Sequence, residues 1–282
     1  MEPWLGMTLL WGLFAGAHIG LATGRARSAL ATRLGERGYG VFFSVIAACC
    51  YSLLITYYAQ HRLEGLPGLA LGRIAALRWA LMGVIVVGLM LMVATFAGYA
   101  RSPYAVLGDG MVRSPRGIER VTRHPFFVGV SLVALAHCLL ATHLVGTIFA
   151  AGFAVLALAG AWHQDRKLTA RRGRPFADYL AATSTVPFGA IVAGRQELTR
   201  GEMPWGALLG GAALAAGLRL LHGSIFAYGG AIVIAVTVGG AAIIAIQDAL
   251  LARRRIAKSR GGRIFDGSGI NARRRARARD RA

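Results

Sequence analysis

Two long stretches of this sequence are almost free of charge, and they limit the possible folds more than any other feature. The stretch Ile74–Tyr99 carries only Arg78 as a charged residue, and Leu144–Trp162 carries none. A helix in a soluble protein presents a charged face to water, whereas a helix that crosses a bilayer needs roughly 20 predominantly apolar residues. Over the whole chain, 56% of the residues are hydrophobic. The sequence therefore predicts an all-α, polytopic integral membrane protein and excludes soluble folds.

The charges between the apolar blocks predict the number and direction of the spans. Segments 24–39, 100–124 and 163–203 and the tail after residue 247 carry four, five, seven and twelve Lys or Arg residues, against four on the opposite side. Because Lys and Arg gather on the cytoplasmic side, this split predicts an outer N-terminus and a cytoplasmic C-terminus. We expect seven transmembrane helices in a bacterial inner membrane. The predicted spans are Pro3–Thr23, Gly40–Gln60, Ile74–Tyr99, Pro125–His143, Leu144–Trp162, Pro204–His222 and Ile225–Gln247.

The composition changes near residue 252 and divides the chain into two parts. Residues 1–251 form the predicted transmembrane domain, and residues 252–282 form a basic tail with too few apolar residues to fold alone. The formal net charge of +20 would suggest a nucleic-acid partner for a soluble protein. In a membrane protein the topology explains it, so we expect no specific nucleic acid. The predicted partner is membrane lipid, with the tail against anionic headgroups.

The two long basic connections are not uniform. Segment 101–124 is broken by prolines and glycines. In the other, residues 163–180 have a helical pattern with one basic face, and residues 181–194 are uncharged. We expect this uncharged piece to be interfacial or re-entrant, because irregular backbone at membrane depth needs protein around it.

Histidines inside apolar segments are the strongest functional signal. His18 lies among Gly and Ala residues, and His137 lies in a run of Leu, Val and Ala, roughly 18 Å along its helix from Pro125. An imidazole surrounded by hydrocarbon costs free energy unless its nitrogens have a partner. Either histidine could instead serve helix packing or a hydrogen bond to a neighbouring helix. His163 and His222 end predicted spans and are reserve ligands.

A cationic group at the start of the fourth predicted span is the second candidate site. Arg120, Arg123 and His124 precede Pro125, whose position in a first helical turn leaves free N–H groups beside them. Arg195 follows the uncharged piece on the same side of the membrane. This group could bind the carboxylates of a cofactor, or it could anchor the chain to lipid headgroups.

Four stretches, taken in order, carry a family resemblance: LFAGAHIG with the following ATRLGERGYGVFFSV, then GIERVTRHPFFVGVSLVALAHCLL, TSTVPFGAIVAGR and LRLLHGSIF. Together they resemble the NnrU family of membrane proteins, which is similar to the plant and cyanobacterial zeta-carotene isomerase. The resemblance implies a link to denitrification in some bacteria. In the isomerase branch it implies a haem b that supports cis–trans isomerisation of an apolar substrate, and His18 and His137 match the positions of the iron ligands. These two histidines would then be both catalytic and metal-binding, with Arg120, Arg123, His124 and Arg195 as cofactor-binding residues.

Two alternatives remain open from the sequence. Residues Arg123–Gly129 and the later DRKLTARRGRPFADYL resemble membrane methyltransferases of the isoprenylcysteine carboxyl type, which use S-adenosylmethionine. There Asp165 and Tyr179 would take cofactor-site positions, but the paired glutamates of that family are absent. The third reading is a non-enzymatic accessory or transport protein that uses the same histidines for packing or to pass on haem or metal.

Overall fold

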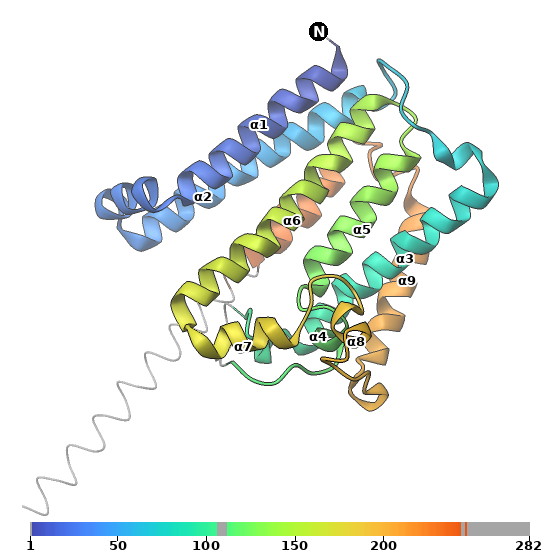
Figure 1. The fold of residues 1–282 in the computed structure, drawn as a ribbon. Helices are drawn as coiled ribbons and strands as arrows, with labels where there is room; N and C mark the ends of the chain where they lie inside the picture. Colours follow the sequence, from blue (N-terminus) through green and yellow to red (C-terminus); the bar gives the residue numbers. More distant parts are fainter. Residues whose placement is uncertain (1, 106–111, 244–245, 247–282) are drawn as a thin grey trace, which may run out of the picture. The chain divides into compact units, whose positions relative to one another are not determined.

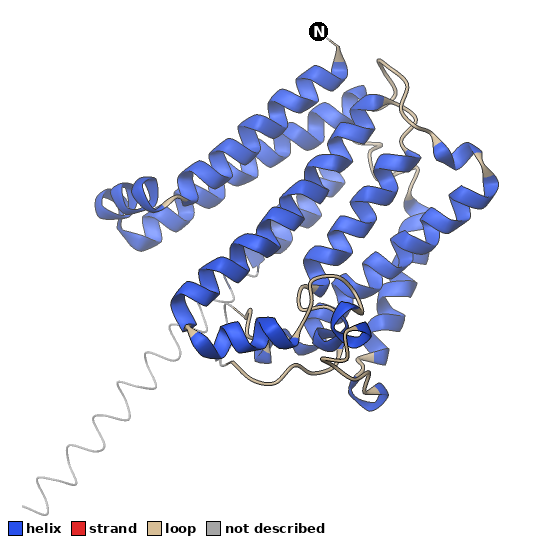
Figure 2. Ribbon diagram, viewed as in Figure 1, coloured by secondary structure: helices blue, strands red, loops and turns tan. Residues whose placement is uncertain are grey.

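The computed structural model describes residues 2–105, 112–243 and 246, and their regular structure is entirely helical (Figure 2). The basic tail and the end of the last predicted span lie outside the described residues. Within the described ranges, an isolated β-bridge joins Pro67 to His143. In chain order, the helices are α1 (Pro3–Ala22), α2 (Gly24–His61), η1 (Leu71–Arg73), α3 (Ala75–Gly98), η2 (Tyr99–Arg101), α4 (Ile118–Val121), α5 (Pro125–Leu140), α6 (Leu144–Arg172), α7 (Arg174–Ala182), α8 (Gly189–Val192), η3 (Arg200–Glu202), α9 (Trp205–Leu221) and a last apolar helix, Ala231–Ile243.

Four of these helices, α1, α2, α3 and α6, are long and apolar enough to cross a membrane, which supports the predicted membrane protein. The other three predicted spans correspond to shorter apolar helices, of which α5 has 16 residues and α9 has 17. The number of seven spans and the orientation of the termini therefore stay predictions.

The structure corrects the predicted boundaries in three places. Segment 24–39, expected as a connection, is the first part of α2, which turns at Gly35 with φ +72. α6 continues past Trp162 to Arg172, so the basic helical segment is its extension. α5 ends at Leu140, where the amide of Ala141 closes the last turn on the carbonyl of His137. His137 thus lies in the last turn of its helix.

The centre of the helical unit is built around α5, which packs against α3 and α6 (Figure 1). α3 also packs against α9, and α1 packs against α2 and α6. The α3–α5 crossing depends on two glycines, because a Cβ on Gly129 would lie 2.4 Å from the carbonyl oxygen of Gly88. Small residues at such crossings let two backbones come close together, as is common between membrane helices.

Hydrogen bonds tie the helix connections together at each end of this unit. At one end, which we call the short-loop end, segments 62–74 and 141–143 meet, with Gly68 N–H donating to Thr142 and Ala70 N–H to Ala141. At the other, the long-loop end, segments 102–124 and 173–204 meet, with Arg123 N–H donating to Ser184 and Phe188 N–H to Val121. The two basic connections of the sequence are thus joined at one end of the helices.

Candidate functional site

A cavity of about 1050 Å³ lies among α3, α5, α6 and α9, and it reaches the short-loop end. Its apolar wall runs along α3 from Met82 to Met92, with Phe149 and Phe153 of α6 on another side. α9 contributes three alanines to the wall, Ala212, Ala215 and Ala216, followed by Leu218 and Arg219 near the end of the helix. The polar lining residues, which include His137, His143 and His222, belong to helix ends and connections at the short-loop end.

His137 points one ring nitrogen at its own helix and the rest of the ring toward the cavity. Its Nδ1 lies 2.7 Å from the carbonyl oxygen of Val133. Because a carbonyl can only accept, Nδ1 carries the proton in the neutral ring, and Nε2 keeps a free lone pair. The ring of His222 is nearly parallel to it, with an interplanar angle of 13° and 6.3 Å between ring centroids. Two of the three histidines that line the cavity thus lie ring to ring, and the hydrogen bond to Val133 fixes the tautomer of His137.

His18 lies in a different environment from His137, the histidine with which the sequence analysis paired it. Its ring stacks on Phe14 of α1 at 5.5 Å and lies 5.0 Å from Phe43 of α2. Its Nδ1 is buried and has no hydrogen-bond partner among the described residues. His18 is not among the cavity-lining residues, whereas the reserve ligand His222 is. The other reserve, His163, is exposed on α6 and does not line the cavity.

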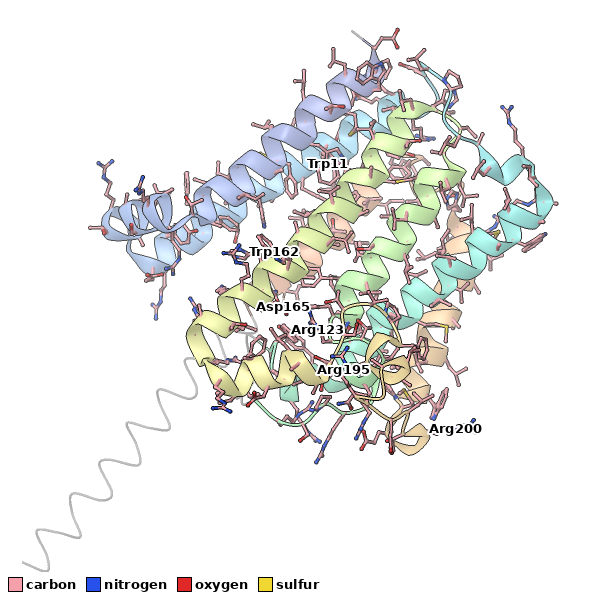
Figure 3. All side chains as sticks on the ribbon, viewed as in Figure 1. Trp11, Arg123, Trp162, Asp165, Arg195 and Arg200 are labelled. Atoms are coloured by element: carbon pink, nitrogen blue, oxygen red, sulfur yellow. The ribbon has the colours of Figure 1, made fainter. Side chains whose placement is uncertain are left out.

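The predicted cationic group lies at the long-loop end, where Asp165 of α6 meets Arg123 (Figure 3). The Asp165 carboxylate accepts from Arg123 Nη2 at 2.9 Å, from His124 Nε2 at 2.8 Å and from the Tyr104 hydroxyl at 2.6 Å. Burial, with the adjacent carboxylate, raises the pKa of Tyr104, so the phenol stays protonated and donates. We call Tyr104, Arg123, His124 and Asp165 the Asp165 cluster.

The other two predicted cofactor-binding arginines also bond to protein groups. Arg120 binds the Glu202 carboxylate, with Nε at 3.0 Å, and the side chain of Gln196. The hydrogen bond that Glu202 accepts from Arg120 and the one that it accepts from the amide of Gly117 lower its pKa. Arg195 donates to the carbonyls of Ala181 and Thr183. The long-loop end thus holds all four predicted residues, each with an acceptor from the chain itself.

Sequence reasoning missed part of this end. Glu119 is buried and binds Arg113 at 2.9 Å, and Tyr104 was not singled out at all. Burial raises the pKa of Glu119. The sequence named Asp165, the partner of Tyr104, only in the methyltransferase alternative, although Asp165 is the only acidic residue of α6 and comes three residues after its apolar run. Among the described residues, no group of three or more His, Cys, Asp or Glu could hold a metal ion.

Comparison with known proteins identifies the family. The NnrU protein family model matches residues 6–246. This chain belongs to the NnrU family. The matched range contains every residue of the cavity and of the Asp165 cluster, so both features belong to the NnrU-like part of the chain.

Two curated proteins are similar to this NnrU family member. The 15-cis-zeta-carotene isomerase, chloroplastic, of Arabidopsis thaliana is 33% identical over 206 residues, which are 70% of this chain and 53% of that protein. The protein of the same name from Zea mays is 32% identical over 203 residues, or 69% of this chain and 52% of that protein. The chain thus spans about half the length of these relatives. No solved structure matches, and none of these matches supports the resemblance to methyltransferases.

Proposed function

We propose that this NnrU-family protein is a membrane cis–trans isomerase whose cavity binds an apolar, polyene-like substrate. The observation that carries the proposal is the apolar cavity with His137 and His222 at its short-loop end. Arg78 and Met92, the first and last lining residues of α3, are 14 positions or about 21 Å of helix apart, which suits a long, narrow molecule. The names of the two curated relatives support the reaction class.

The residues of the cavity fit the haem b that the family resemblance implies. A histidine that binds a metal typically donates its other ring N–H to a carbonyl, and His137 does so to Val133. We propose that His137 would be one of the residues that hold the haem iron. His18 is the second ligand suggested by the sequence, and His222 is the one suggested by the structure, because its ring lies beside that of His137. Bound there, haem would supply a Lewis-acid or one-electron centre.

The chain's own residues would bind the substrate, hold it in position and keep water away. Cis–trans isomerisation transfers no atom to or from the substrate, so the site needs no nucleophile or proton relay at the reacting bond. The cavity-lining residues accordingly include no Asp or Glu. Leu89, Phe149 and Phe153 give the wall rigid apolar surface, while the alanines of α9 leave room for a chain that changes shape.

The charge distribution of the sequence supports a proposed location and orientation. We propose that the protein lies in the bacterial inner membrane with its long-loop end in the cytoplasm, and that the tail 252–282, outside the described residues, lies against anionic lipid headgroups. The proposal keeps the link to denitrification that the family resemblance implies. The alternative to it is an accessory protein that passes on haem without catalysis.

Absorption spectra of the purified full chain test the haem and its ligands. We expect wild type from haem-replete cells to show a Soret band that His137→Ala abolishes, while the exposed control His163→Ala leaves it unchanged. A shifted or lost band in His222→Ala but not in His18→Ala would identify the second ligand as His222, and the reverse as His18. Turnover is measured as conversion of a cis polyene by chromatography. A colourless wild-type protein without turnover would refute the proposal.

A further inference from the structure

Three arginines at the short-loop end line the cavity, although each comes from a different helix. Arg62 follows the last turn of α2, Arg78 lies in the first turn of α3, and Arg219 lies in the last turn of α9. The charge count assigned only four Lys or Arg residues to this side of the membrane, namely these three and Arg73. Three of the four thus face one cavity, on the side where the positive-inside rule disfavours them.

These arginines have no acidic partner within the described residues. No carboxylate lines the cavity, and Glu64, the acid in the same connection, binds His61 at 2.7 Å. Arg62 donates to the carbonyls of Ala59 and Phe226. The guanidinium groups of Arg78 and Arg219 have no hydrogen-bond acceptor in the described part of the chain; that of Arg78 lies over the ring of Trp79 at 5.8 Å. Cations without a counter-ion beside an apolar cavity are suited to an anionic ligand.

We propose that the cavity binds an amphiphile with a long apolar body and an anionic head group, and that Arg62, Arg78 and Arg219 bind that head. The inference rests on the proposed function in using the same cavity, and it adds the charge of the ligand. The apolar wall from Met82 to Met92 accepts the body, while the arginines fix which end lies at the short-loop end. An uncharged polyene would leave the guanidinium groups without an anion. The carboxylate could belong to the substrate itself or to a porphyrin.

Binding of a fluorescent polyene fatty acid and of its methyl ester tests the charge directly. The probe is cis-parinaric acid, titrated into the full chain in an uncharged detergent. We expect wild type to bind the acid about tenfold more tightly than the ester, as one charge-assisted hydrogen bond would give. In Arg78→Gln/Arg219→Gln the acid should bind about tenfold more weakly, while the ester binds as before. Arg73→Gln is the matched control, because it removes the fourth arginine of this side without touching the cavity.

Equal dissociation constants for acid and ester in wild type would overturn the inference. The inference would also be overturned if the double variant still bound the acid more tightly than the ester. The same holds if Arg73→Gln weakened binding of the acid as much as the double variant does. Competition with protoporphyrin IX and with its dimethyl ester identifies the carrier of the anion. If only the free porphyrin displaces parinaric acid, the arginines serve porphyrin carboxylates; if neither does, they serve the substrate, and both results support an anionic head.

The two proposals can fail separately. A colourless and inactive protein that still prefers the acid would refute the proposed isomerase and keep the anionic ligand. A coloured and active protein that binds acid and ester equally would keep the isomerase and refute the anionic ligand. The affinity ratio therefore gives information that neither the spectrum nor the turnover contains.

Discussion

Replacing Asp165 by Asn should destabilise the protein by about 3–5 kcal/mol, the range found when one partner of a buried ion pair is removed. The side chain of Asp165 is 11% exposed and that of Arg123 is 18% exposed, so solvent screens this pair little. The asparagine oxygen can still accept from Tyr104 or His124, but its amide cannot neutralise the guanidinium. Tyr104→Phe removes one bond to the ion and keeps the charge pair, so we expect a smaller loss of about 1.5–3 kcal/mol.

The free energy of unfolding can be measured by titrating SDS into mixed micelles and recording the helical circular dichroism. Asp178→Asn is the matched control, because Asp178 is exposed on α7 and lacks a hydrogen bond or ion pair within the described residues. It should change stability by less than about 0.5 kcal/mol. If Asp165→Asn lies within about 1 kcal/mol of wild type, or if the control is equally destabilising, the carboxylate does not hold this end of the helices together.

Two further predictions concern helix packing and pH. Gly129→Ala should cost about 1–3 kcal/mol or more, because the new methyl group meets the carbonyl of Gly88, while Gly83→Ala on the open side of α3 should be neutral or stabilising in the same SDS titration. Glu202 has a lowered pKa in the folded state, so its contribution is present above the ordinary value of 4.5 and is lost as pH falls below it. Glu202→Gln should therefore flatten the acid side of the stability profile; an unchanged profile would show that the bonds from Arg120 do not stabilise the fold.

The class of fold could be predicted from the sequence because long uncharged runs admit few structures. The ranges for α1 and α3 agree with the prediction to within a residue at each end, since clear apolar limits mark both. The first part of α2 could not be predicted in the same way, because segment 24–39 is rich in arginine and reads as a connection. The end of α5 depends on hydrogen bonds between segment 141–143 and the distant segment 62–74, which no local pattern shows.

The candidate residues were easier to predict than their neighbours in space. The sequence singled out His137 and kept His222 as a reserve, and the structure brings their rings together. It paired His137 with His18, whose ring contacts Phe14 and Phe43. Charge counting named Arg62, Arg78 and Arg219 only as exceptions to a rule. They line one cavity because α2 and α9 end, and α3 begins, at the same end of the helical unit. The periodicity within a single helix does not predict this arrangement.

The length of α6 has a consequence for how the cavity could open. Phe149 lines the cavity and Asp165 is the centre of the cluster at the opposite end; the two residues are 16 positions or about 24 Å apart on one continuous helix. Helix shifts that accompany conformational changes are about 1–2 Å, and a displacement of that size would stretch the bonds from Arg123, His124 and Tyr104 together. A movement of α6 along its axis that widened the cavity at the short-loop end would therefore also strain the Asp165 cluster at the long-loop end.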